Sequence, residues 1–265
     1  MLIAQLLAVL ALQTYGDAAM AKLPDGFRPT SLAGVEMSEG RFTQGAATAL
    51  VTRADLGGVP TLVVAFRGSD GAQDWRTDLR DINLAYGKFQ PLVRAVENYA
   101  SAGGRVLLVG HSQGGAVVQI FMYAHRGQDR YRAVTFGSPG ARPQQGTFAA
   151  AADPRITNYA VSDDPFVFLA GHRAEVVSYA VRHPLYGLML AQGIAAESGL
   201  SLLSVLLGAR ATSDSYLNNG LRVRLEGVRS GLTIRSMLRS DPAEHEPETY
   251  AKLLESRFAS APALW

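Results

Sequence analysis

Cysteine is absent from this sequence of 265 residues. Its absence excludes disulfides, thiolate zinc sites and cysteine nucleophiles, although it does not fix the compartment, since a core of this size needs no disulfide. A strong charge of either sign is also lacking, because 25 Lys and Arg stand against 23 Asp and Glu. The basic residues are scattered, so nucleic acid is not expected as a partner. A charged fraction of 18% and a hydrophobic fraction of 48% exclude a disordered chain.

The N-terminal apolar run is too short to cross a membrane. Residues 2–12 read LIAQLLAVLAL, whereas a membrane span needs roughly 20 residues. Ala19-Met20-Ala21 resembles a cleavage site of the Ala-x-Ala kind, which gives the run the outline of a signal peptide, but no basic residue precedes the run and the first one in the chain is Lys22. We expect a buried first helix here. Residues 1–21 leave the localisation open between the cytoplasm, export by a non-standard route and secretion.

A second apolar stretch, residues 185–209, approaches the length of a membrane span. It carries Gln192, Glu197 and several serines and glycines, and such polar groups are costly inside a bilayer. We therefore expect a helical hairpin that packs on the body of the protein or caps a pocket.

Between these stretches, apolar runs alternate with segments of helical spacing. Residues 61–66 and 105–110 are continuous apolar runs, as expected of strands covered on both faces. Strands separated by helices imply parallel pairing with right-handed crossovers. Further strands are expected over 46–53, 131–137 and 155–161, weaker ones over 175–181 and 221–226, and helices over 91–99 and 113–125. The sequence predicts one α/β domain over residues 1–265, with a mostly parallel sheet flanked by helices.

A catalytic motif follows one of these buried strands. Residues 110–115 read GHSQGG, which is the G-x-S-x-G pattern in its strand–turn–helix context. Glycines flank the serine because side chains in so tight a turn would collide with neighbouring elements. The hydroxyl of Ser112 then projects at the carboxyl edge of the sheet, where a helix N-terminus favours developing negative charge. The pattern predicts Ser112 as a nucleophile.

A serine nucleophile needs a base, and the base needs an orienting acid. In this fold the order along the chain is serine, acid, histidine. Asp163 and Asp164 directly follow the strand expected over 155–161, so either is a candidate acid. Among the five histidines, His245 lies on a late polar loop, which suits a base that reaches across to Ser112. His111 adjoins the nucleophile and is expected to belong to the packing of the turn.

Four sequence blocks resemble the class 3 (fungal-type) lipase family, which has the α/β-hydrolase fold. They read FRGSD at 66–70, DWRTDL at 74–79, GHSQGG at 110–115 and TFGSP at 135–139. The resemblance implies a carboxylic ester hydrolase, a lipase or esterase that acts on acyl lipids such as triacylglycerols or phospholipids. It implies an acyl-enzyme on Ser112, with no metal or organic cofactor. It also implies oxyanion donors at Ser69, through its amide and hydroxyl, and at Gln113, through its amide.

The same resemblance bears on the acid and the base. In that family the acid stands in an Asp-x-Val-Pro-like segment, which Asp164 fits better than Asp163. The histidine of the family precedes a tyrosine of the final helix, as His245 precedes Tyr250. The interval between acid and base is longer here than the family needs, and residues 185–209 look like the insertion responsible. That departure keeps His183 as an alternative base.

The segment that corresponds to the family's lid is unusual. Residues 70–81 read DGAQDWRTDLRD, whereas a lid that binds lipid interfaces should carry an apolar face. Trp75 and Leu79 are its one apolar pair at helical spacing. The expected partners are an acyl ester or lipid substrate and a transient contact with a membrane or lipid interface. Two rival functions are an acyltransferase with the same triad and a non-catalytic membrane- or partner-binding protein on a hydrolase scaffold.

Overall fold

A mixed sheet forms the centre of the computed structural model, which describes residues 3–16, 23–68, 82–142, 151–198, 216–229, 231–237 and 241–258. The sheet has eight strands in the order β1-β3-β4-β5-β6-β7-β8, and β2 pairs with β3. The strands are β1 (Arg28–Pro29), β2 (Arg41–Gln44), β3 (Ala47–Asp55), β4 (Pro60–Phe66), β5 (Arg105–His111), β6 (Tyr131–Phe136), β7 (Ile156–Val161) and β8 (Leu221–Leu225). Strands β4 to β8 are parallel, and β1, β2 and β4 pair antiparallel with β3. The predicted mostly parallel sheet is confirmed.

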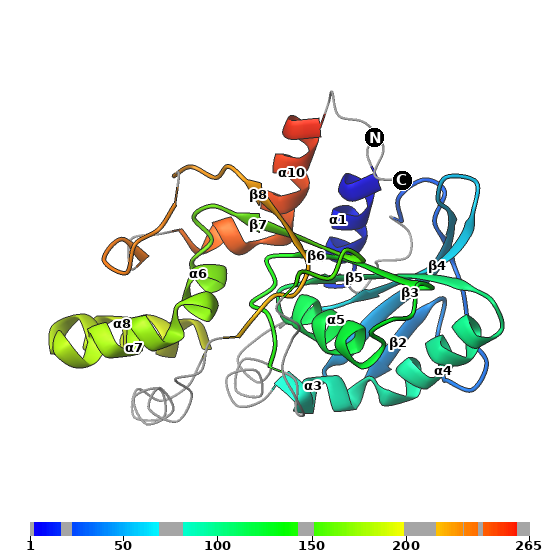
Figure 1. Ribbon diagram of the computed structural model, residues 1–265, viewed down its shortest axis with the longest axis horizontal. Coiled ribbons are helices and arrows are strands. Elements are labelled where there is room, and N and C mark those ends of the chain that lie inside the picture. The colour runs from blue at the N-terminus through cyan, green and yellow to red at the C-terminus, as the bar shows by residue number, and fades with distance from the viewer. Residues whose placement is uncertain are drawn as a thin grey trace.

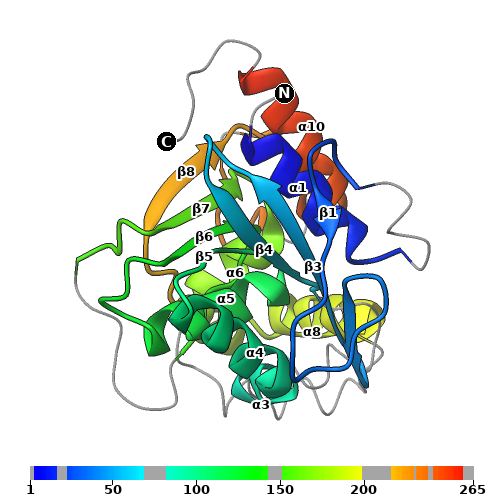
Figure 2. The same cartoon turned by 90° about the vertical axis from the view of Figure 1, so that its right-hand side faces the viewer.

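Helices cover both faces of this sheet (Figures 1 and 2). One face carries α1 (Ile3–Gln13) and α10 (Pro247–Phe258), and the other carries α3 (Ile82–Lys88), α4 (Gln90–Ser101) and α5 (Gln113–Ala124). Alternate residues of β4 enter the two cores: Leu62 and Val64 pack with α4 and α5, and Val63 and Ala65 pack with α1 and α10. A strand covered on both faces needs apolar residues throughout, which explains the continuous runs in the sequence.

The first helix lies where the sequence predicts it. In α1, five apolar residues are buried: Ala4, Leu7, Ala8, Leu10 and Ala11. They belong to the core that α1 shares with α10 and with the central strands. Within the ranges that the structure describes, no helix is both long and apolar enough to cross a membrane.

One predicted strand is wrong. Residues 175–181 belong to helix α7 (Arg173–Arg182), not to the sheet. Their valines favour extended backbone, but a strand also needs a neighbour for its hydrogen bonds. The segment lies beyond the carboxyl edge of the sheet, next to α6 (Pro165–Gly171) and α8 (Pro184–Ser198) (Figure 1). A helix satisfies its backbone groups internally, so it is the structure this position allows.

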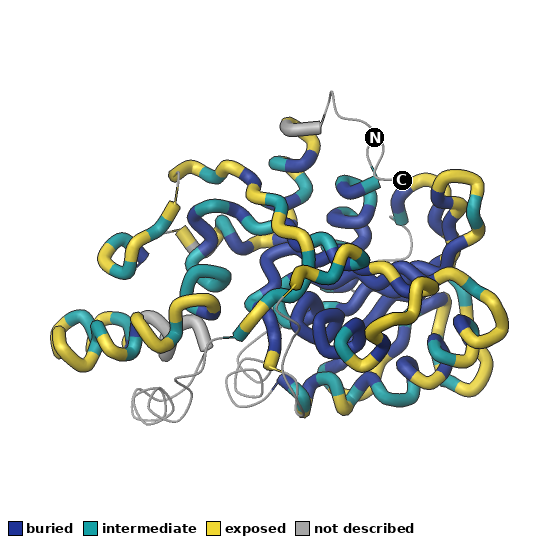
Figure 3. The backbone as a smooth tube through the Cα atoms, in the orientation of Figure 1, coloured by how far each residue is buried: buried dark blue, intermediate teal, exposed yellow. Residues whose placement is uncertain are grey.

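The insertion expected over residues 185–209 is helical as far as the structure describes it. Residues 185–198 lie in α8, which packs against α7. Both helices are largely exposed and extend away from the sheet (Figure 3). Leu185 and Met189, one helical turn apart, are 80% and 58% exposed. Residues 199–209 lie outside the described residues.

Candidate active site

Ser112 occupies a strained turn between β5 and α5. Its backbone has φ 53° and ψ −125°, in the left-handed half of the map that residues other than glycine rarely enter. The Ser112 amide donates a hydrogen bond to the carbonyl of Phe136 at 3.0 Å, which ties the turn to β6. This is the local geometry that the motif predicts: a serine exposed on a sharp strand-to-helix turn.

Two glycines of the motif are required by close backbone approach. A Cβ atom on Gly114 would lie 2.1 Å from the carbonyl oxygen of Phe66, and one on Gly110 would lie 2.3 Å from the carbonyl carbon of Gly114. No side chain fits at such distances. The end of β4, the turn and the start of α5 are thereby packed backbone to backbone.

His245 joins Ser112 to Asp164. Its Nε2 atom is 2.8 Å from Ser112 Oγ, and its Nδ1 atom is 2.7 Å from Asp164 Oδ2. Asp164 is almost fully buried and His245 is buried apart from its edge. A carboxylate can only accept, so Nδ1 carries the ring hydrogen and Nε2 is left to accept a hydrogen bond from the serine hydroxyl. Three residues distant in sequence thus form one hydrogen-bonded chain.

The carboxylate of Asp164 is held by four donors. Oδ1 accepts from the amides of Phe166 and Val167 at 2.9 and 3.0 Å, as the N-cap of α6. Oδ2 accepts from the hydroxyl of Tyr250 at 2.7 Å, in addition to His245. Burial, with the neighbouring Asp164 charge, raises the pKa of Tyr250 well above its ordinary value, so the phenol stays a neutral donor. These bonds compensate the burial of a charge and fix its orientation.

His111 fastens the loop of His245 to the turn of the nucleophile. Its Nε2 atom is 2.7 Å from the carbonyl oxygen of His245, and its Nδ1 atom is 2.8 Å from the hydroxyl of Tyr15. Burial, and then the neighbouring His245, lower the pKa of His111 to about 3. The ring is therefore neutral, with Nε2–H donating to the carbonyl and Nδ1 accepting from Tyr15. The sequence predicts that His111 packs at the turn. It contains no signal that His111 contacts Tyr15 or His245.

Acid is expected to destabilise the fold through His111. The residue stays neutral in the folded chain down to about pH 3, whereas in the unfolded chain it binds a proton below about 6.5. Stability from this residue is therefore complete above pH 6.5 and falls by about 1.4 kcal/mol per pH unit below it. The slope reaches this value only about one pH unit below 6.5, where the unfolded residue is almost fully protonated, so the loss between pH 6.5 and about pH 5 should be about 1.5 kcal/mol. Urea unfolding at the two pH values measures it.

The matched variant for this prediction is His111→Gln, whose amide can still donate to the His245 carbonyl. It should lose about 1.5 kcal/mol less than the wild type over the same pH interval. Equal losses in the two proteins would show that His111 is not the group that titrates on unfolding.

The two alternative candidates lie apart from Ser112. Asp163 is buried, and its Oδ2 accepts from the amide of Arg229 at 2.7 Å, on the side of β8. His183 is exposed between α7 and α8, with its ring 4.2 Å from that of Tyr179. The structure therefore brings Asp164 and His245 to the nucleophile, and leaves Asp163 and His183 elsewhere.

The expected oxyanion donors are described in part. Gln113 is the first residue of α5, where amides have no partner within the helix. Gly68, two residues after β4, lies against the nucleophile: a Cβ atom there would be 2.9 Å from Ser112 Cβ. Ser69 and the segment 70–81, with Trp75 and Leu79, lie outside the described residues. Nowhere in the described ranges do three or more potential ligands gather as a metal site would require.

A comparison with protein families agrees with this architecture. A family model described as the alpha/beta hydrolase family matches residues 40–258. A comparison with curated proteins finds no match. Among solved structures, a Rhizomucor miehei lipase–propeptide complex is similar at 16% identity and a TM-score of 0.45, over 64% of this chain and 63% of that one. The mono- and diacylglycerol lipase from Aspergillus oryzae is similar at 18% identity and a TM-score of 0.39, over 63% of this chain and 72% of that one. No activity or substrate follows from likenesses of this degree.

Proposed function

Because this chain belongs to the alpha/beta hydrolase family, we propose that it hydrolyses carboxylic esters through an acyl-enzyme on Ser112. The predicted fold class, an α/β-hydrolase with a mostly parallel sheet, is confirmed. The observation that carries the proposal is the hydrogen-bonded chain from Ser112 Oγ through His245 to the buried carboxylate of Asp164. We also propose that residues 1–265 form one domain of this kind.

The proposed reaction uses each of these groups in turn. Ser112 Oγ attacks the ester carbonyl carbon while His245 Nε2 takes the hydroxyl proton, and the Asp164 carboxylate stabilises the imidazolium that results. The amides of Gln113 and Ser69, with the Ser69 hydroxyl, stabilise the tetrahedral oxyanion. His245 then returns the proton to the leaving alcohol. Water repeats the sequence on the acyl-enzyme and releases the carboxylic acid.

The substrate class that we propose is an acyl lipid, either a glyceride or a phospholipid, as the resemblance to class 3 lipases implies. The exposed apolar residues of the two protruding helices support it. Val181 on α7 and Leu185 and Met189 on α8 are 65%, 80% and 58% exposed. Exposed apolar residues gathered on a helical surface are typical of contacts with lipid or protein.

Labelling with a fluorophosphonate tests the reaction, because such reagents trap activated serines. We expect one adduct per chain, located on Ser112 by peptide mass spectrometry, and none after denaturation. A series of p-nitrophenyl esters from acetyl to palmitoyl, and phospholipid vesicles, then tests the substrate. Turnover that rises with acyl length or on vesicles supports a lipase. A folded protein that is neither labelled nor active on any ester contradicts the proposal.

A further inference from the structure

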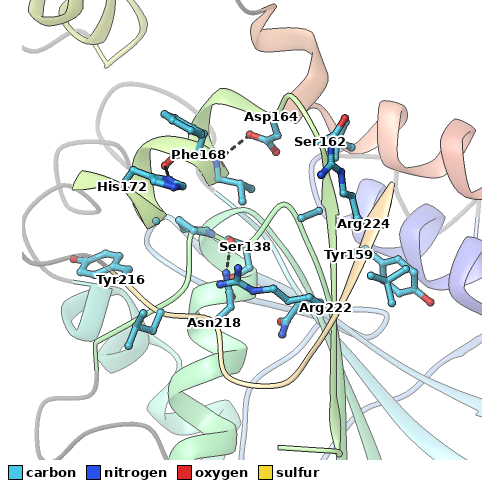
Figure 4. Close-up of a pocket in the computed structure, with 18 residues that line it drawn as sticks. Ser138, Tyr159, Ser162, Asp164, Phe168, His172, Tyr216, Asn218, Arg222 and Arg224 are labelled. Atoms are coloured by element: carbon cyan, nitrogen blue, oxygen red, sulfur yellow. Dashed lines mark hydrogen bonds between the residues drawn. The ribbon is translucent and has the colours of Figure 1, made fainter. Parts of the chain in front are cut away.

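A separate cavity of about 450 Å³ lies beside the triad (Figure 4). Its walls are α6, the turn after β6, the end of β7 with the turn that follows it, and the chain from residue 216 through β8. Among the residues described, Asp164 is the one member of the triad that lines it, and neither Ser112 nor His245 does. The volume falls in the range of roughly 300–1,000 Å³ that small-molecule sites occupy.

One side of this cavity is cationic. Arg222 and Arg224 are two residues apart on β8, so both side chains leave the same face of the sheet, and both line the cavity. Figure 4 shows the Arg222 side chain reaching toward Asn218 and Ser138. Arg224 pairs with Glu226 at 3.6 Å, whereas Arg222 has no hydrogen-bond or ion-pair partner within the described chain. A free guanidinium fork matches the geometry of a carboxylate or a phosphate.

The carboxylate of Asp164 does not compete with a bound anion for the Arg222 guanidinium. Both of its oxygens are already engaged, Oδ1 by two amides of α6 and Oδ2 by His245 and Tyr250. Asn218 adds a neutral polar group, since its Nδ2 donates to the Ser138 carbonyl at 2.8 Å while its buried Oδ1 has no partner among the described residues.

The opposite side of the cavity is apolar. Val167 and Phe168 line it from α6, and Pro139 lines it from the turn after β6. A small inorganic anion would leave this surface unused. An acyl or alkyl chain attached to the anion would cover it and gain the free energy of removing apolar area from water.

We propose that this cavity binds an anionic amphiphile, a carboxylate or phosphate group joined to an acyl chain. The oxyanion binds the Arg222 guanidinium, and the chain lies against Val167 and Phe168. This site goes beyond the proposed hydrolysis and is separate from Ser112. The experiment that tests it therefore measures ligand binding and not turnover.

Isothermal titration calorimetry tests the site with decanoate and decyl phosphate, each below its critical micelle concentration. The wild type should bind at least one of them, and comparing the two distinguishes a carboxylate from a phosphate head group. Acetate and inorganic phosphate, which have no chain, should bind at least tenfold more weakly. Equal affinity for inorganic phosphate and decyl phosphate would overturn the proposal that the ligand is an amphiphile.

Arg222→Gln should weaken binding at least tenfold, because it removes the charge and the fork. Arg94→Gln is the matched control, since Arg94 is exposed and does not line the cavity, and its helix α4 lies apart from α6 and β8 (Figure 1). Circular dichroism checks that both variants fold. Arg222→Lys keeps the charge without the fork and should lie between wild type and Arg222→Gln. Affinities that are equal in Arg222→Gln and Arg94→Gln, or no binding by the wild type, would overturn the proposal.

Discussion

Replacing Ser112 with alanine is expected to reduce kcat for a short p-nitrophenyl ester by about 10⁴-fold or more. The Ser112 hydroxyl is the group that His245 Nε2 contacts at 2.8 Å, and alanine leaves the base with nothing to activate. The turn itself should survive, because its geometry depends on Gly110, Gly114 and the bond to Phe136. Steady-state kinetics with purified proteins measures the loss. Ser178→Ala, at an exposed position of α7, is the control and should stay within twofold of wild type.

The base is expected to behave as part of the same unit. His245→Ala should lose about as much activity as Ser112→Ala, and the double variant should lose little more, because residues that act together are not additive. His183→Ala should retain wild-type activity, since His183 is exposed beside Tyr179. If His183→Ala lost its activity while His245→Ala stayed active, His183 would be the base instead of His245.

Asp164→Asn is expected to reduce kcat by about 10³- to 10⁴-fold while the protein stays folded. An asparagine presents one oxygen and one NH₂ group where the carboxylate presents two oxygens. If the NH₂ group replaces Oδ2, it opposes the donors of His245 and Tyr250. If it replaces Oδ1, it opposes the amides of Phe166 and Val167. Either orientation disrupts the histidine tautomer or the cap of α6.

Stability should fall with activity in this variant. We expect a loss of about 1–3 kcal/mol in the free energy of unfolding, because buried donors lose their acceptor. Urea unfolding measures this loss, and ester hydrolysis measures kcat. Asp163→Asn is the matched control: the neighbouring carboxylate is equally buried, but Oδ1 has no partner within the described chain and Oδ2 accepts from Arg229. Its kcat should stay within about threefold of wild type. A larger loss in Asp163→Asn than in Asp164→Asn would reverse the assignment of the acid.

Much of the candidate site could be anticipated from local pattern. The turn around Ser112 was predictable because its glycines, strand and helix are adjacent in sequence. The end of the strand at Val161 limited the candidate acids to Asp163 and Asp164. In the structure the side chain of Asp164 contacts His245, whereas that of Asp163 contacts the amide of Arg229. The class 3 lipase resemblance remains a prediction within the broader family. The helix over 173–182 was missed because the valines there favour a strand, while the absence of an available sheet edge is a tertiary fact.

The sequence by itself determined the layered α/β architecture, the strained turn at Ser112 and the short set of residues from which an acid and a base could come. These features depend on residues that are neighbours along the chain, so the apolar runs and the glycine positions are enough to predict them. Only the tertiary structure decided that His245 meets both Ser112 and Asp164, that Tyr250 shares the carboxylate, and that Tyr15 and His111 hold the loop of the base. These contacts join Tyr15 just after α1, His111 and Ser112 at the end of β5, Asp164 after β7, His245 in the 3-10 turn Pro242–His245, and Tyr250 in α10. Their distances depend on how the helices pack on the sheet, and no local pattern encodes that packing.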